Sequence, residues 1–349
     1  MHEVGSCSVT EVRGQPPLVA VVTGVYNGQP YLRRTLECVQ AQTYSNIVHV
    51  VLDNASTDDT ADVIANNTVG RVPILTERNP SLLPQLANWN AAAAMVPAEA
   101  RYIKLLAADD LMRADCIERL VDVAEANPDV NFVTALDVFD HRVKPHGLDP
   151  GESIFDGREV ARRLLQRNIH WMPFHHAFFR ATPNHRSRLF DPDVVPGFDR
   201  DLVVRLLLEG KMGFVNEPLF YTRYHASNVT AALIAKGALL CERIPELQRY
   251  GRELLSEAEI ERQYEIELHM ILRQALFRVA RRQFSVAANV RNQLASLGVV
   301  PSVLDYVASV LTWPTHRARK RRREAAYRAV TPPTRITESE FLTWPLHLV

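Results

Sequence analysis

Two adjacent aspartates, Asp109 and Asp110, are the residues of this chain whose type and spacing most suggest chemistry. They follow the apolar run Tyr102–Leu106, which predicts that they leave a buried strand at its carboxyl end. Adjacent carboxylates repel each other unless a cation lies beside them, and hard oxygen ligands suit Mg²⁺ or Mn²⁺. The pair is therefore a candidate metal site, although a solvated turn before the next helix would use the same residues.

Polar residues also follow two other predicted strands. Tyr26 and Asn27 come after the first apolar run of the chain, and Asp53 and Asn54 come after the second. The side chains of Asp53 and Asn54 suit hydrogen bonds to a base edge or a ribose hydroxyl, but they are equally common in simple strand-to-helix turns. Alone, these positions are weak candidates for nucleotide binding.

A third group lies further along the chain. Asp199 stands at the start of a predicted helix, where an acid serves as a helix cap or as a general base. His225 follows the apolar run Pro218–Tyr221, and a neutral imidazole there can ligate a metal or fill a structural role.

The elements that must position these residues alternate between two patterns in the first third of the chain. Short apolar runs predict buried strands, and the segments between them have helical spacing, so we expect βαβ units and a largely parallel sheet. Ligands of such sheets lie beyond the carboxyl ends of the strands, so the polar clusters should converge on one crevice. The predicted strands are Leu18–Val22, Ile47–Leu52, Val72–Leu75 and Tyr102–Leu106, and the predicted helices between and after them are Tyr31–Val39, Thr57–Ala65, Gln85–Met95 and Cys116–Glu125.

Composition limits the class of protein without identifying it. The 349 residues include 40 Lys or Arg and 40 Asp or Glu, so no overall field favours nucleic acid. The four cysteines form no CxxC pair, which fits a reducing compartment. We see no secretory signal and no apolar run long enough to span a membrane, and we therefore expect a cytoplasmic protein.

The turn after the first strand excludes two common nucleotide-binding classes. A nicotinamide-dependent oxidoreductase needs G-x-G-x-x-G there, whereas this chain has TGVYNG. The GxxxxGK[ST] sequence of a P-loop enzyme is absent as well.

Several ordered motifs resemble those of family-two glycosyltransferases with the GT-A fold. The opening LVAVVTGVYNGQPYLRRTLECVQAQTYSNIVHVVLDNASTDDT is similar to the first two strands and intervening helix of that family. NWNAAAAMV followed by YIKLLAADDLMRADCIERL resembles the segments around the family's DxD-like motif. GFDRDLVVRLLLEGKMGFVNEPLFYTRYHASN resembles its base motif and its R-x-H element, so the resemblance covers residues 18–228.

The resemblance implies an α/β fold of the GT-A type, which is a Rossmann-like three-layer α/β/α sandwich. We expect a polar leader over residues 1–17 and a GT-A domain over 18–228, whose nucleotide-binding half (18–110) precedes an acceptor half (111–228). Helical spacing beyond residue 228 predicts a C-terminal helical extension over 229–349.

The resemblance also implies roles for individual residues. Asp199 would be the catalytic base, and Asp109, Asp110 and His225 would hold Mn²⁺ or Mg²⁺. The residues expected to bind the nucleotide-sugar donor are Gly24, Tyr26, Asn27, Asp53, Asn54, Asn88, Asp109 and Arg223.

The chain departs from the family pattern at three positions. Ala107 stands where many members have the first acid of a D-x-D-D run, Phe198 replaces an acid beside the base, and Asn54 replaces a frequent aspartate. Which member of the aspartate pair would hold the metal is therefore open. The missing acid at Ala107 also allows a second hypothesis, a non-catalytic nucleotide-sugar-binding or scaffold protein. The presence of Asp199 and His225 argues against it.

The implied function is inverting, hexosyl-type transfer from a nucleotide sugar to an acceptor hydroxyl, in the synthesis of a polysaccharide, glycolipid or other glycoconjugate. The transition state has oxocarbenium character, and negative charge grows on the departing diphosphate. A divalent ion would neutralise that charge, and the base would take the acceptor proton. Trp171, His175 and His176 are candidates for an acceptor site because such rings stack on sugars, although buried packing is an equal alternative.

The run Arg317–Arg323 is the strongest local charge, and it follows the apolar stretch Tyr306–Trp313. This pairing suits peripheral contact with the anionic inner face of a membrane, where a lipid-linked acceptor would lie. A solvated helix face or a dimer contact explains the same pattern. Nucleic-acid binding does not fit the balanced charge of the rest of the chain.

Overall fold

The computed structural model describes residues 15–170, 172–194, 197–225, 237, 239–330 and 335–343 of the chain. The strands of this part are β1 (Val19–Val25), β2 (Ile47–Asp53), β3 (Ile74–Arg78), β4 (Tyr102–Leu105), β5 (Leu111–Met112), β6 (Val130–Phe139), β7 (Arg142–Lys144), β8 (Ile154–Phe155), β9 (Phe178–Arg180) and β10 (Lys211–Thr222). The helices are α1 (Gln29–Gln40), α2 (Thr60–Ala65), α3 (Gln85–Ala94), α4 (Cys116–Ala126), α5 (Gly157–Leu165), the 3₁₀ helix η1 (Phe174–His176), α6 (Pro183–Ser187), α7 (Phe198–Leu208), α9 (Arg243–Leu254), α10 (Glu257–Ala280), α11 (Phe284–Ser296), α12 (Val303–Leu311), α13 (Trp313–Val330) and α14 (Glu338–Leu342).

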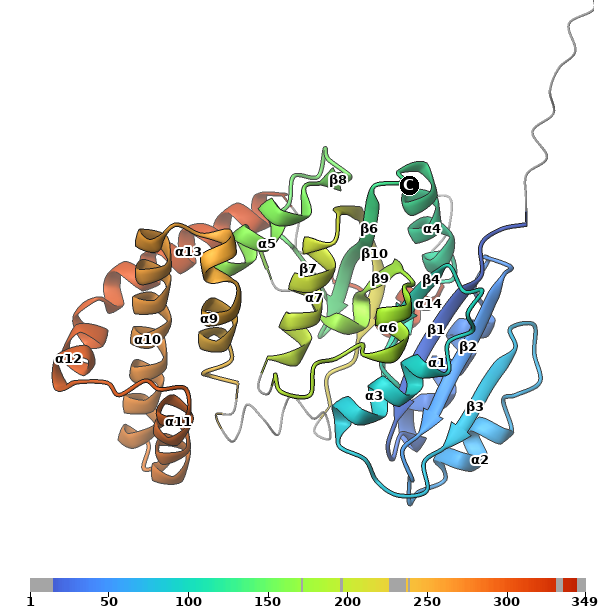
Figure 1. The fold of residues 1–349 in the computed structure, drawn as a ribbon, viewed down its shortest axis with the longest axis horizontal. Coiled ribbons are helices and arrows are strands. Elements are labelled where there is room, and N and C mark those ends of the chain that lie inside the picture. The colour runs from blue at the N-terminus through green and yellow to red at the C-terminus, as the bar shows by residue number, and fades with distance from the viewer. Residues whose placement is uncertain are drawn as a thin grey trace, which may run out of the picture.

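One mixed sheet organises the domain, with the strand order β3-β2-β1-β4-β9-β6-β10-β5 among the described residues. The first four strands in this order run parallel, as the alternating pattern predicts. Nearly every residue of β1 and β2 is buried, because helices cover both faces of the sheet (Figure 1). The α/β class predicted from the sequence is therefore confirmed.

The second half of the sheet contains both parallel and antiparallel pairs. β9 runs antiparallel to both β4 and β6, and it joins the parallel first half to the parallel pair β6–β10. Because β1, β2 and β4 are parallel, their carboxyl ends meet at one edge of the sheet. The residues expected to carry the chemistry follow these ends.

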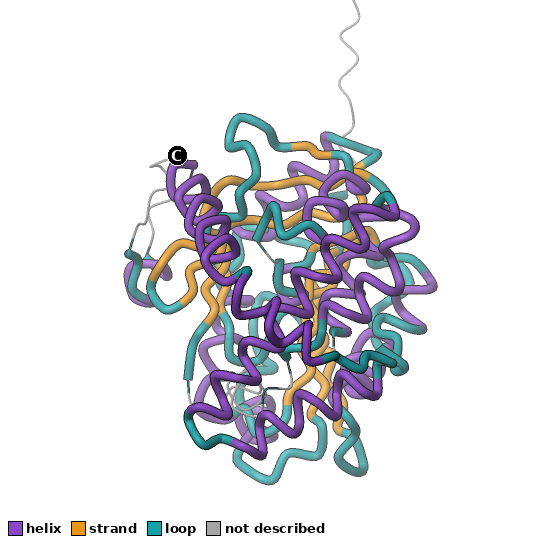
Figure 2. The backbone as a smooth tube through the Cα atoms, turned by 90° about the vertical axis from the view of Figure 1, so that its left-hand side faces the viewer, coloured by secondary structure: helices purple, strands orange, loops and turns teal. Residues whose placement is uncertain are grey.

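The helical region after residue 228 packs partly on the sheet domain and partly on itself (Figure 2). Leu247 and Tyr250 of α9 join the main core, whereas α10 and α11 enclose a second cluster around Leu272 and Val290. Within the predicted helical extension, α12 and α13 are separated by a break at Thr312. No helix in the described ranges is both long and apolar enough to cross a membrane.

The C-terminal end of the described chain returns to the sheet domain. Ile336 and Phe341 are 1% and 0% exposed and belong to the main core. The Ile336 amide donates to the His141 carbonyl (2.9 Å), beside β7. The sheet domain therefore takes part of its core from beyond the predicted boundary at residue 228.

Candidate active site

The loops after β1, β2, β4 and β10 are joined by hydrogen bonds at the carboxyl edge of the sheet. The Asn27 amide donates to Ser56 Oγ (2.9 Å), and the Thr57 amide donates to Asn27 Oδ1 (2.8 Å). The Arg223 amide donates to Asp110 Oδ1 (3.1 Å), which links the loop after β10 to the loop after β4. Thr35 of α1, the helix after the β1 loop, donates to the Ala108 and Asp110 carbonyls (2.9 Å each) and so connects the two pairs of loops into one site.

Asp109 faces His225 at this edge. Asp109 Oδ2 and His225 Nε2 are 3.0 Å apart, and the two side chains are 29% and 14% exposed. The His225 imidazole stacks on the Tyr31 ring, with centroids 4.1 Å apart and planes inclined by 20°. A carboxylate and an imidazole are thus held side by side within reach of solvent.

Asp110 points inward instead. It is 4% exposed, and its Oδ2 lies 3.2 Å from His175 Nε2. Burial, with Asp109 and Asp137 nearby, raises the pKa of Asp110 well above its ordinary value. Burial and the Lys104 ammonium lower the pKa of His175 to about 3, so this imidazole is neutral.

The expected metal trio is therefore divided into two pairs. Asp109 lies with His225, and Asp110 lies with His175. Among the residues described, no three His, Cys, Asp or Glu side chains gather closely enough to hold a metal ion by themselves. Asp110 is thus turned toward the core, and Asp109 is the member of the pair that lies beside His225.

Several expected donor-binding residues use their side chains to build the wall of the site. Asn54 Oδ1 accepts from the Leu83 amide and from Asn79 Nδ2, both at 2.9 Å, and Asn79 Nδ2 also donates to Asn88 Oδ1 (2.9 Å). Gly24 leaves room for this network, because a Cβ there would lie 2.8 Å from Asn88 Nδ2. Gly24, Asn54 and Asn88 thus position the segment that leads into α3.

The remaining donor-binding candidates differ in exposure. The Asp53 carboxylate is buried, accepts from the Ser56 amide (2.9 Å) and lies 3.0 Å from Arg78 Nη1. Tyr26, which follows β1, is 47% exposed. Asn27 has a φ of 50°, a left-handed conformation that asparagine tolerates and that turns the chain toward α1.

Two acids in the first turn of α7 differ in their partners. Asp201 is engaged, because its Oδ2 accepts from Arg205 Nε (2.9 Å) and its Oδ1 accepts from the Tyr250 hydroxyl (2.6 Å). Asp199 accepts only from the adjacent Arg200 amide (2.9 Å) among the contacts of the described residues. Burial raises the pKa of Asp199 above its ordinary value. Asp199 is therefore the acid of this turn that is available to a ligand.

Aromatic contacts connect α7 with the aspartate pair. The Phe174 ring lies 5.4 Å from the ring of His175 and 5.9 Å from the ring of Phe198, the neighbour of Asp199. The 3₁₀ helix η1, which carries Phe174 and His175, thus bridges the candidate base and the Asp110 pair.

The three expected acceptor residues have different outcomes. His176 is 2% exposed, and its Nε2 lies 3.0 Å from Thr222 Oγ1, so its ring is not accessible to an acceptor. His175 is largely buried against Asp110. Trp171 lies outside the described residues. Packing in the core, the alternative left open by the sequence, is what the structure shows for His176.

Glu338 of α14 is a site residue that sequence reasoning did not find. Its carboxylate accepts two hydrogen bonds from Arg223, from Nε at 3.0 Å and from Nη2 at 2.7 Å. Arg223 Nη1 in turn donates to the Asp109 carbonyl (2.9 Å). The pattern T-E-S-E at Thr337–Glu340 signals a helix start, but no local pattern relates it to a residue over a hundred positions earlier.

Replacing Glu338 with Gln is expected to raise the donor KM by about tenfold, with a smaller change in kcat, because a charge-assisted bidentate contact contributes about 1.5–3 kcal/mol. The loss would free Arg223 from its fixed contact with the Asp109 loop. Steady-state kinetics with varied donor measure the effect. Glu340→Gln is the matched control, because Gln preserves the capping box of the same helix. An equal KM change in both variants would show that only the docking of α14 matters.

The sheet, its reversed strand β9 and the acidic residues at the carboxyl edge define a GT-A domain, the fold of nucleotide-sugar glycosyltransferases. A solved structure with this fold is the mannosyltransferase PcManGT from Pyrobaculum calidifontis in complex with GDP-Man and Mn²⁺. It superposes with a TM-score of 0.53 at 18% identity, over 90% of this chain and 86% of that chain. The predicted GT-A fold with a helical C-terminal region is confirmed.

Residues 20–187, just under half of the chain, match the family model of glycosyl transferase family 2. An uncharacterized glycosyltransferase of Nostoc sp. is 25% identical over 221 residues, which are 60% of this chain and 66% of that protein. The Escherichia coli UDP-Glc:alpha-D-GlcNAc-diphosphoundecaprenol beta-1,3-glucosyltransferase WfaP is 33% identical over 93 residues, 27% of this chain and 36% of WfaP. The chain thus spans just under two thirds of the Nostoc relative. The resemblance to this family that the ordered motifs predict is confirmed over these residues.

Proposed function

We propose that this protein is an inverting, hexosyl-type glycosyltransferase that moves a sugar from a nucleotide-sugar donor to an acceptor hydroxyl in glycan biosynthesis. The observation that carries the proposal is the arrangement of Asp109 beside His225 at the carboxyl edge of the sheet. Asp199 on α7 supplies a further acid, which accepts from the Arg200 amide (2.9 Å) and whose pKa burial raises. The match of residues 20–187 to the glycosyl transferase family 2 model supports the same reaction class.

Asp199 acts as the general base in this proposal. Its raised pKa reflects burial, and it makes the carboxylate a better proton acceptor than an exposed aspartate. The acceptor hydroxyl gives its proton to Asp199 Oδ as its oxygen bonds to the anomeric carbon, and the bond from that carbon to the donor diphosphate breaks. Attack from the face opposite the diphosphate inverts the configuration.

Asp109 and His225 fit a divalent cation of the Mn²⁺ or Mg²⁺ type. A carboxylate oxygen and an imidazole nitrogen 3.0 Å apart can share one ion, and Mg²⁺ commonly takes only one or two protein ligands together with substrate phosphates. Held by these residues, such an ion would supply positive charge that neutralises the departing diphosphate. Of the two aspartates, we assign the metal to Asp109, because Asp110 is buried against His175.

In this proposal the exposed ring of Tyr26 stacks on the donor base, and Arg223, beside the Asp109 loop, contacts the diphosphate. The donor base is open, since WfaP is named for UDP-Glc and PcManGT was solved with GDP-Man. WfaP is also named for a diphosphoundecaprenol-linked sugar, and we propose a glycan or lipid-linked acceptor for this chain. The enzyme would then work in the cytoplasm, at the inner face of the membrane.

A panel of nucleotide sugars, each with and without Mn²⁺, tests the proposal by thermal unfolding. A ligand at about 100 times its Kd adds about 2.7 kcal/mol of stability, so the true donor should raise Tm clearly, and only with the metal present. Release of the nucleotide from that donor is then measured with candidate acceptors. A panel in which no nucleotide sugar raises Tm contradicts the proposal, and binding without transfer or hydrolysis favours the non-catalytic alternative.

A further inference from the structure

Helix α12 turns its apolar face outward. Val303, Leu304, Val307 and Leu311 are 79%, 78%, 49% and 73% exposed, whereas Ser309 on the opposite side is buried. Positions 303, 307 and 311 follow one another at helical spacing, so they form a continuous stripe. A helix on a globular domain normally packs such a stripe on the core, and an outward stripe indicates a surface that meets another apolar medium.

The next helix presents positive charge. Six of the seven residues of Arg317–Arg323 are Arg or Lys. Lys320 lies 3.7 Å from Glu324, but no carboxylate of the described residues lies in ion-pair range of Arg317, Arg319 or Arg321. Because the whole chain has a net charge of zero, this positive field is a local feature of α13.

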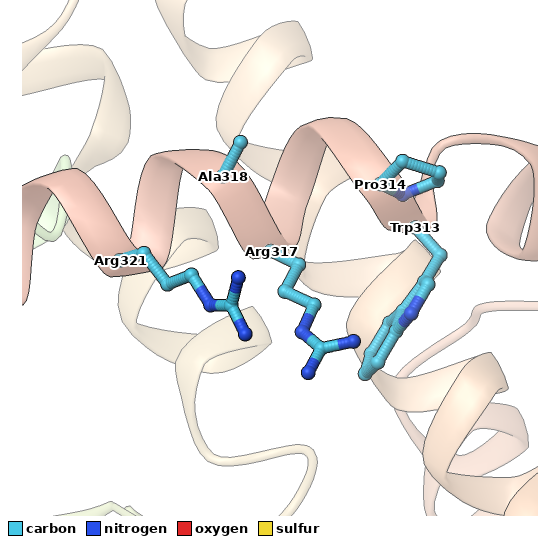
Figure 3. Close-up of a pocket in the computed structure, with 5 residues that line it drawn as sticks. All are labelled: Trp313, Pro314, Arg317, Ala318 and Arg321. Atoms are coloured by element: carbon cyan, nitrogen blue, oxygen red, sulfur yellow. The ribbon is translucent and has the colours of Figure 1, made fainter.

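Trp313 joins the apolar and basic parts. It is 45% exposed, and Arg273 of α10 lies over its ring at 4.5 Å, which fixes the indole at the start of α13. Trp313, Arg317 and Arg321 point to the same side of the helix and line a recess of about 470 Å³ (Figure 3). An indole beside guanidinium groups is typical of protein that lies at a membrane–water interface.

We propose that α12 and the first half of α13 form a surface that binds a membrane carrying anionic lipids. The α12–α13 surface consists of Leu304, Val307, Leu311, Trp313, Arg317 and Arg321. The apolar side chains enter the boundary between head groups and acyl chains, while the guanidinium groups pair with lipid phosphates. Only the idea that the membrane delivers a lipid-linked acceptor rests on the proposed function; the binding itself does not.

A membrane fits this surface better than the other partners that could cover it. A second copy related by a two-fold axis would bring the same patch to itself, and the clustered cations of Arg317–Arg323 would then repel each other. An acidic polymer would pair with the cations but would leave Leu304 and Leu311 in water. A membrane with anionic lipids satisfies both parts at once.

Co-sedimentation of the full chain with vesicles tests the proposal. We expect strong binding to phosphatidylcholine mixed with phosphatidylglycerol and weak binding to phosphatidylcholine alone. Each basic side chain contributes about fivefold near an anionic surface, so Arg317→Gln with Arg321→Gln should weaken binding by about thirtyfold. Leu304→Asp with Val307→Asp should also abolish the part of the binding that survives high salt, because that part is apolar.

The matched control for the arginine variant is Arg252→Gln with Arg291→Gln, which removes two exposed cations elsewhere in the helical region. The control for the leucine and valine variant is Val69→Asp, because Val69 is an apolar residue of the sheet domain that is 96% exposed. These controls should bind as the parent does, and equal Tm values show that the variants fold. Equal binding of the parent to both vesicle types, or unchanged binding of the surface variants, overturns the proposal. So does a parent that binds polyglutamate but no vesicles, or a dimer that Leu304→Asp dissociates. Vesicle binding without any donor binding would refute only the proposed function.

Discussion

Asp199→Asn is expected to keep donor binding and to lower sugar transfer by about 10² to 10⁴-fold, the usual contribution of a general base. The amide has nearly the shape of the carboxylate but cannot take the acceptor proton. Because only the deprotonated acid is active, the parent rate should fall as pH drops through the raised pKa of Asp199. In the variant, the transfer rate should not show this fall at low pH. Single-turnover transfer measured across pH, with donor binding followed by Tm, checks each part.

Asp193→Asn is the matched control, because it is the same chemical change at an exposed position in the loop before α7. Asp201→Asn provides a contrast, since it disrupts contacts with Arg205 and Tyr250 and should lower the free energy of unfolding by about 1–3 kcal/mol. Transfer by Asp199→Asn at the parent rate would show that another group takes the proton. Loss of donor binding in the same variant would instead place Asp199 in the donor site.

Asp109→Asn is expected to remove the Mn²⁺-dependent rise in Tm with donor and to lower transfer by about 10² to 10³-fold, since a metal at a leaving phosphate supplies several kcal/mol. Asp109 is the partly exposed acid beside His225 and is therefore placed to meet the ion. Removal of the metal from the parent with a chelator should lower transfer to the same extent. Added Mn²⁺ should then restore transfer by the parent but not by Asp109→Asn.

Asp110→Asn is the informative comparison for this result. Asp110 is buried, with Arg223 N–H donating to it and His175 at its other oxygen. Because its pKa is raised well above the ordinary value, a neutral amide replaces a group that burial already drives toward its neutral form. Asp110→Asn should therefore retain the Mn²⁺ response. If Asp109→Asn kept the Mn²⁺-dependent rise in Tm and Asp110→Asn lost it, the metal ligand would be Asp110 instead.

The sequence predicted the sheet well where local pattern decides structure. The apolar runs at Ile47–Leu52 and Tyr102–Leu106 correspond to β2 and β4 within a residue, because a strand buried on both faces must be apolar throughout. The strand predicted at Val72–Leu75 is shifted, and β3 is Ile74–Arg78, an edge strand with exposed side chains that pattern marks poorly.

The sequence by itself determined that the acids and polar residues of the site follow the ends of parallel strands. This follows from short-range information, because alternating strands and helices force those ends to one edge of the sheet. The ordered motifs, which are also short-range information, indicated the resemblance to family-two glycosyltransferases.

Only the tertiary structure decided which of these side chains face the solvent, which face the core, and which partners they contact. Asp109 and Asp110 are neighbours in sequence, yet one faces solvent beside His225 and the other faces His175 in the core. The turn after β4, in which the Asp110 amide donates to the Ala107 carbonyl (3.2 Å), directs the two side chains apart. Glu338 reaches Arg223 across 115 residues, and α12 turns its stripe outward through packing on α10. Such contacts depend on the path of the whole chain, which no local spacing of residues records.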